Sequence, residues 1–245
     1  MNSGQHDSGT KTVLGQTCES GDQVIDILTT HTQGGRNVCA SFITAKLFSF
    51  LAYPVAVNDP SLDGFVGAFV GSGLSIRALA EAILKSAMFS SERAYRALVK
   101  SPVELAVSTM RILGGERIPD WGVHNEIEAQ GQRLFFPPDV GGWTSGSGWI
   151  NASSLLSRCN MAARIVAGLG GSHSDEIGGL PVTGLVELLT TGSAKVDTVL
   201  GLLVDDNVPT GTREPLVAYA ETSITDTRFR GLFDLVMALP EYQLN

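Results

Sequence analysis

The spacing of apolar residues constrains the fold of this chain more than any other feature. In several segments, large apolar side chains recur every three or four residues, the period of a helix that is buried on one side. Ile76, Leu79 and Ile83 form one such stripe, and Glu81 and Lys85 stand one turn apart on another face. Alternating apolar and polar residues, which are typical of strands, are essentially absent. The sequence therefore predicts a mostly α-helical fold: an irregular multi-helix domain with long ordered loops and only short pieces of strand.

Start and stop signals place these helices along the chain. Ser20 and Ser75 each stand where a capping side chain is expected, just before an apolar stripe. The strongest start is Ser101, followed by Pro102 and by Glu104 at the third helical position. Helices are predicted over 21–30, 76–85, 102–113, 125–130, 152–166, 185–190, 194–204, 215–221 and 227–238, and either Asn151 or Ser153 is expected to cap the helix over 152–166.

A further helix is predicted between His31 and Pro54. Its apolar residues recur at helical intervals, and Pro54 prevents its continuation. They are Val38, Phe42, Ile43, Leu47, Phe50 and Leu51. Because so many positions are apolar, we expect this helix to be strongly buried.

Composition excludes several classes of partner. The formal net charge is −8, and nucleic-acid binding needs clustered Lys and Arg, so no nucleic-acid partner is expected. No apolar run reaches the roughly 18 residues that a membrane-spanning helix needs, so no transmembrane segment is expected. Charged residues make up 17% of the chain, below the usual quarter, which indicates that much of the chain is buried.

Motifs for a metal or a cofactor are missing from the sequence. The three cysteines are far apart, with no CxxC pair that would indicate a zinc or redox site. There is no P-loop, no GxGxxG after a strand and no GxSxG nucleophile elbow. We therefore expect neither a metal nor a cofactor, and no catalytic residue can be assigned.

The domain prediction is a single helical domain over 1–245. No repeat of 20 to 50 residues is evident, which disfavours a solenoid. The glycine-rich segment 168–179 is the best candidate for a flexible loop.

The segment from Leu134 to Asn151, LFFPPDVGGWTSGSGWIN, is the main candidate for function. Its large aromatics distinguish it from a linker and predict an ordered loop. Trp143 and Trp149 could offer their faces to a flat ligand such as a sugar ring, with Asp139 and Asn151 giving directional hydrogen bonds. Alternatively, both indoles could fill the core while the glycines permit tight turns.

Several phrases resemble one family in matching order. They are HDSGTKTVLG, FITAKLFSFL, ILKSAMF, KSPVELAVSTMRILG, FFPPDVGGWTSGSGWINASSLLSR and FDLVMALPEYQLN. The chain is similar to the C-terminal half of the bacterial family catalogued as domain of unknown function 1800, most specifically in P-x-x-V-x-G-W-x(5)-W-[IL]-N. HTQGGRNV departs from the family's pattern after His31. The resemblance implies the C-terminal part of a longer exported protein of the periplasm or cell surface, but it carries over no reaction.

Two functions stay open at this point. The first is an exported binding or scaffold module, with a polysaccharide or a protein partner at the cell surface bound through the aromatic loop. The second is a hydrolase acting on an extracellular polymer, with its site completed by a missing N-terminal half. If that half is missing, apolar surface on the first helices should lack its cover.

Overall fold

The computed structural model describes residues 7, 9–113, 122–168, 176–177, 180–181, 189–221 and 226–245. Its contacts group the chain into two compact units, an N-terminal unit (1–97) and a C-terminal unit (98–245). Both units are mainly helical, which confirms the predicted fold class. The single domain over 1–245 stays a prediction. Most of the glycine-rich segment 168–179 lies outside the described residues.

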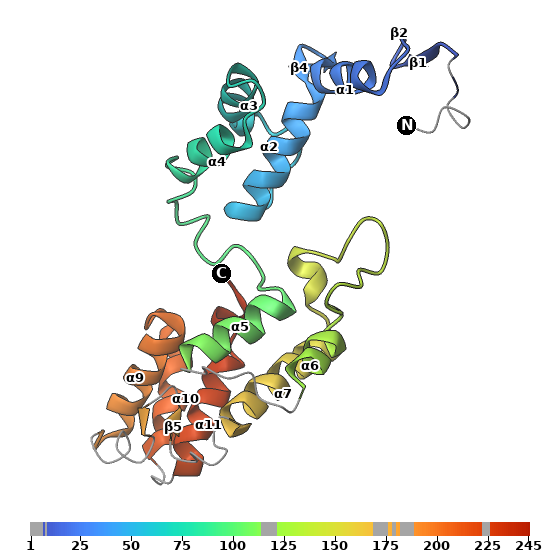
Figure 1. Ribbon diagram of the computed structural model, residues 1–245. Coiled ribbons are helices and arrows are strands. Elements are labelled where there is room, and N and C mark those ends of the chain that lie inside the picture. Colours follow the sequence, from blue (N-terminus) through green and yellow to red (C-terminus); the bar gives the residue numbers. More distant parts are fainter. Residues whose placement is uncertain are drawn as a thin grey trace. The chain divides into compact units, whose positions relative to one another are not determined.

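The N-terminal unit contains four described helices and two short hairpins (Figure 1). The helices are α1 (Gly21–Thr30), α2 (Val38–Leu51), α3 (Asp63–Gly71) and α4 (Ile76–Leu84), and the 3-10 turn η1 (Pro60–Leu62) precedes α3. The antiparallel hairpins are β1 (Lys11–Val13) with β2 (Gln16–Cys18), and β3 (Thr32–Gln33) with β4 (Arg36–Asn37).

The core of this unit lies between α2, α3 and α4. Phe48, Leu62, Leu79 and Ile83 are completely buried there, and the ring of Phe48 meets that of Tyr53 edge-on at 5.0 Å between centroids. Edge-to-face rings of this kind add to the stabilisation that burial provides. One face of α2 is thereby fixed against its neighbours.

The prediction that α2 is strongly buried is wrong for its opposite face. Val38 is 40% exposed, Phe42 44% and Phe50 73%. The helix is apolar on nearly all sides, and α3 and α4 can cover only the side that faces them. A periodic pattern reports which residues are apolar, but it does not report how many neighbours are present to cover them.

The C-terminal unit is a larger bundle around a second core. Its elements are α5 (Pro102–Ile112), α6 (Val123–Ala129), η2 (Gly146–Trp149), α7 (Ala152–Gly168), β5 (Glu176–Ile177), β6 (Leu180–Pro181), α9 (Gly192–Val204), α10 (Thr210–Glu221), α11 (Asp226–Met237) and η3 (Pro240–Gln243). The helices α7 and α9 both pack on α11. Ile165, Leu200 and Val236 of these helices are buried in one core together with Leu105 of α5. Among the described residues, no helix is both long and apolar enough to cross a membrane.

Helix α10 starts earlier than predicted. The sequence predicts this helix over 215–221, but it begins at Thr210 and contains Pro215 in its interior. A proline there costs one backbone hydrogen bond, and the buried Leu216 and Ala220 still anchor the helix. The predicted helix over 185–190 falls largely outside the described residues.

Side-chain caps fix most of the other helix starts. The hydroxyl of Ser101 accepts from the amide of Glu104 at 3.3 Å, and the carboxylate of Glu104 accepts from the amide of Ser101 at 2.7 Å. This reciprocal pair satisfies two amides that the helix itself leaves unpaired. The sequence prediction for α5 is therefore confirmed down to the capping atoms.

Replacing Ser101 with Ala should lower the free energy of unfolding by about 1 kcal/mol, because the Glu104 amide loses its acceptor. Chemical denaturation measures this difference. Ser153→Ala, an exposed serine within α7, is the matched control and should change stability by less than about 0.5 kcal/mol. Equal effects of the two substitutions would show that the cap contributes nothing.

Candidate functional site

The candidate site is the loop between α6 and α7, drawn in yellow-green in Figure 1. It has no helix or strand of its own except the 3-10 turn η2. Its entry is tied to α5, since the amide of Val103 donates to the side-chain oxygen of Gln132 at 2.9 Å. Its exit is tied to α7 by Asn151, so the loop is held at both ends.

Asn151 acts as a helix cap. Its side-chain oxygen accepts from the amide of Ser154 at 2.9 Å, and the hydroxyl of Ser154 accepts from the amide of Asn151 at 2.9 Å. The same hydroxyl donates to the carbonyl of Trp149 at 2.8 Å. These bonds confirm Asn151, one of the two residues proposed from the sequence, as the cap of α7. The hydrogen bond that Asn151 was expected to give a ligand stays a prediction.

Asp139 shapes the far end of the loop. Its carboxylate accepts from the amide of Gly141 at 2.7 Å, and its carbonyl accepts from the amide of Gly142 at 3.2 Å. Gly142 has a φ of +91°, a conformation that residues with a Cβ rarely adopt. The side chain of Asp139 remains exposed, so its second oxygen can still meet a partner.

The two tryptophans have different environments. Trp149, in η2, is 5% exposed, so both faces of its ring are covered. Trp143 is half-buried, and its Nε1 has no hydrogen-bond partner. An unpaired buried donor is uncommon in folded proteins and needs an explanation. Of the two indoles, only Trp143 has surface available for a ligand in this arrangement.

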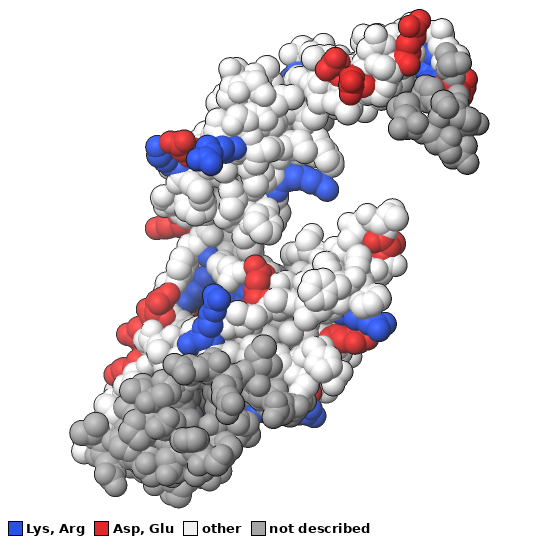
Figure 2. All heavy atoms as spheres, in the orientation of Figure 1, with Lys and Arg blue, Asp and Glu red and all other residues white. Residues whose placement is uncertain are grey.

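The most exposed part of the loop is an apolar tip that the sequence analysis did not single out. Phe135 is 90% exposed, Phe136 is 63% exposed and Val140 is fully exposed. Phe135 has a φ of +63°, which is rare for a bulky residue, and the guanidinium of Arg133 lies 4.5 Å from the ring centre of Phe136. In Figure 2 the loop surface is mostly uncharged. In the sequence, this tip could have been recognised only from three large apolar residues that lie in a segment without a helical or strand period.

The chemistry of this loop is that of a contact surface. Apolar rings, one indole and one exposed carboxylate can bind a partner, but they do not form a nucleophile with a base. Within the ranges that the structure describes, no three His, Cys, Asp or Glu side chains lie close enough to hold a metal ion. The three cysteines are all free.

A second polar cluster lies inside the C-terminal unit. Arg158 is completely buried; it donates to the carbonyl of Lys100 at 2.7 Å and to the side-chain oxygen of Gln243 at 3.2 Å. The ammonium of Lys100 donates to the carbonyl of Tyr242 at 2.8 Å, and burial lowers the pKa of Arg158. Both cations thus bind backbone or amide oxygens, which hold the segment after α11 against residues 98–100.

Tyr242 completes this cluster. Its hydroxyl lies 2.7 Å from that of Thr109, which donates its own proton to the carbonyl of Leu105, so Tyr242 is the donor. Burial raises the pKa of Tyr242 to about 12. The cluster supports the fold, because its hydrogen bonds join α5, α7 and the segment after α11, although the Nε of Arg158 is buried without a partner.

A comparison with known protein families confirms the resemblance that the sequence phrases indicated. The family model described as "Protein of unknown function (DUF1800)" matches residues 1–244, which include the whole loop from Leu134 to Asn151, called the contact loop below. The chain belongs to this family. No curated protein and no solved structure matches it. Membership in the family therefore assigns no reaction to the loop, and its geometry has to carry the functional argument.

Replacing Trp149 with Ala should destabilise this family member by roughly 3–5 kcal/mol, since it removes a large buried ring under the loop. Trp143→Ala, at a half-buried position, is the matched control and should cost clearly less. Chemical denaturation followed by circular dichroism measures both. If the two variants lost equal stability, Trp149 would not be the ring that holds the loop in place.

Tyr242→Phe should lower the free energy of unfolding by about 1 kcal/mol near neutral pH, because a buried hydrogen bond to Thr109 is lost. The pKa of Tyr242 is raised in the folded protein, so the wild-type protein should lose additional stability as pH rises from 10 towards about 12. The variant should lack that additional loss. Denaturation midpoints between pH 7 and pH 11 measure it, with the exposed Tyr95→Phe as control. Identical alkaline slopes for wild type and Y242F would contradict the prediction.

Proposed function

We propose that this chain is an exported binding or scaffold module that contacts its ligand through the loop from Leu134 to Asn151. The observation that supports this most is the exposure of Phe135, Phe136 and Val140 on one ordered loop. Large apolar side chains exposed together on one short segment commonly mark interaction surfaces. The exported location is supported by the family resemblance.

The ligand class we propose first is an extracellular polysaccharide. Trp143 supports this choice, because it is only partly buried and the exposed part of its indole ring can stack on the apolar face of a sugar ring. Its Nε1 is itself buried and is not counted as a contact to the sugar. Asp139 is exposed on the same loop and can accept from further hydroxyl groups. A protein partner at the cell surface is the other ligand that this loop could hold. The alternative hydrolase gains no specific support from the described residues.

Retention on insoluble polysaccharides tests the proposal. The full chain is mixed with cellulose, chitin and peptidoglycan, and the bound fraction is measured after sedimentation. Trp143→Ala should weaken retention by about tenfold or more, as expected for a central contact residue. Leu156→Ala, which changes an exposed apolar residue of α7 outside the loop, should leave retention unchanged.

The melting temperature of each variant separates loss of binding from loss of folding. A folded W143A protein that binds as well as wild type, or a wild-type chain retained on none of the three polymers, would remove polysaccharide from the proposal.

A further inference from the structure

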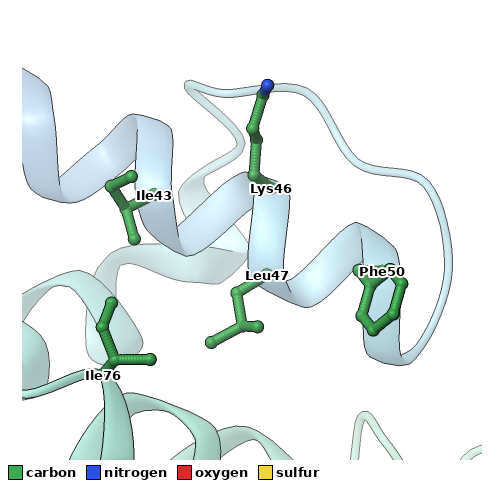
Figure 3. A pocket seen from close by; sticks show the side chains of 5 residues that line it. All are labelled: Ile43, Lys46, Leu47, Phe50 and Ile76. Atoms are coloured by element: carbon green, nitrogen blue, oxygen red, sulfur yellow. The ribbon is translucent and has the colours of Figure 1, made fainter. Parts of the chain in front are cut away.

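The N-terminal unit has an open apolar groove between α2 and α4. It is lined by Ile43, Lys46, Leu47, Phe50 and Ile76 and has a volume of about 250 Å³. Ile43 and Leu47 point towards Ile76, and Phe50 stands at one end (Figure 3). The groove is smaller than the roughly 300–1,000 Å³ of sites that hold whole organic ligands. Its size suits one or two protruding side chains.

The charge beside this groove limits what can occupy it. Lys46 contributes its aliphatic stem to the lining, and its ammonium extends away from Ile76 (Figure 3) to lie 4.9 Å from the ring centre of Phe42. Among the described residues, no carboxylate lies within ion-pair distance of that ammonium. An occupant that brings apolar side chains and one carboxylate would complement both features.

The tip of the contact loop has this combination. Phe135, Phe136 and Val140 project into solvent, and Asp139 places an exposed carboxylate directly beside Val140. The positive φ of Phe135 fixes the backbone in a conformation that is rare for such a residue. Groove and tip are therefore both apolar, and they carry opposite charges.

We propose that the loop tip of one copy of this chain docks into the α2/α4 groove of a second copy. Phe135 or Phe136 fills the space between Leu47, Phe50 and Ile76, and the carboxylate of Asp139 pairs with the ammonium of Lys46. This inference rests on the proposed function in one respect, that the loop is a contact surface; it adds the identity of a partner. Because tip and groove are different surfaces, copies join either as a reciprocal pair or as an open chain.

The mass of the full chain in solution tests this directly. Sedimentation velocity over a concentration series should show species heavier than the 25.9 kDa monomer as concentration rises. Phe135→Asp on the tip and Phe50→Asp in the groove should each yield a monomer at concentrations where the wild type is half associated. The controls Leu84→Asp and Leu156→Asp change similarly exposed residues outside both surfaces and should associate like wild type.

Mixing the F50D and F135D variants distinguishes the proposed contact from non-specific association. The F50D copy keeps an intact tip, and the F135D copy keeps an intact groove. An equal mixture should therefore form a dimer through one intact contact and nothing larger, although each variant alone is monomeric. A mixture that remains monomeric would overturn the proposal, as would association that survives either substitution alone.

A double-mutant cycle tests the ion pair. Lys46→Met and Asp139→Asn should each weaken association by about two- to fivefold, and the double variant should be no weaker than either single variant. Asparagine keeps the oxygen that accepts from the Gly141 amide, so the turn is preserved. Fully additive effects would show that these two residues do not meet.

The remaining outcomes distinguish this inference from the proposed function. A chain that is monomeric at every concentration, yet held on polysaccharide through Trp143, overturns the self-association alone. A chain that associates through tip and groove without binding any polysaccharide overturns only that ligand class. If F135D instead abolishes sedimentation with phosphatidylcholine vesicles and leaves the mass unchanged, the tip binds lipid and the proposed docking is wrong.

Discussion

The amides at the start of each helix need acceptors from outside the helix, and this requirement organises most of the chain. The first four amides of a helix have no partner within it, and helices as short as these are marginal without help. In six helices a side chain immediately before the first turn supplies an acceptor. These residues are Ser20, Asn37, Ser75, Ser101, Asn151 and Thr191. The caps determine where the helices begin, and so which apolar residues face the two cores.

Because a cap acts over three residues, the sequence could predict most helix starts. Ser20, Ser75 and Ser101 are each followed by an apolar stripe, and each caps as expected. The hairpin of β1 and β2 gave no such signal, since its turn places Leu14 at a φ of +48°, where Asn or Gly would be usual. The predicted start of α10 at 215 is too late, because Pro215 lies inside a helix that begins at Thr210. The residues near a helix end predict where the helix begins or ends only if their local conformational preference agrees with the tertiary packing of that helix.

The candidate site was predictable in part for the same reason. The order of the loop follows from its two prolines, its glycines and its aromatic residues, and the cap at Asn151 is a local feature. The burial of Trp149 and the exposure of Phe135 depend on which residues of distant segments lie above them. A ring that fills a core and a ring that meets a ligand have the same sequence signature. Only the three-dimensional contacts distinguish them, and they leave the tip of the loop uncovered.

The low content of charged residues acquires a different meaning in the structure. At 17%, it indicated extensive burial, because surfaces are normally rich in charged side chains. Both units have a core of buried apolar residues, but apolar residues also occupy the surface, on the outer face of α2 and on the tip of the contact loop. Scattered apolar residues on a surface are ordinary, whereas groups of them on one helix face or one loop are not. The scarcity of charge is therefore explained by two uncovered apolar surfaces as well as by two cores. Covering either surface with another molecule would be favourable, because it would remove apolar area from water.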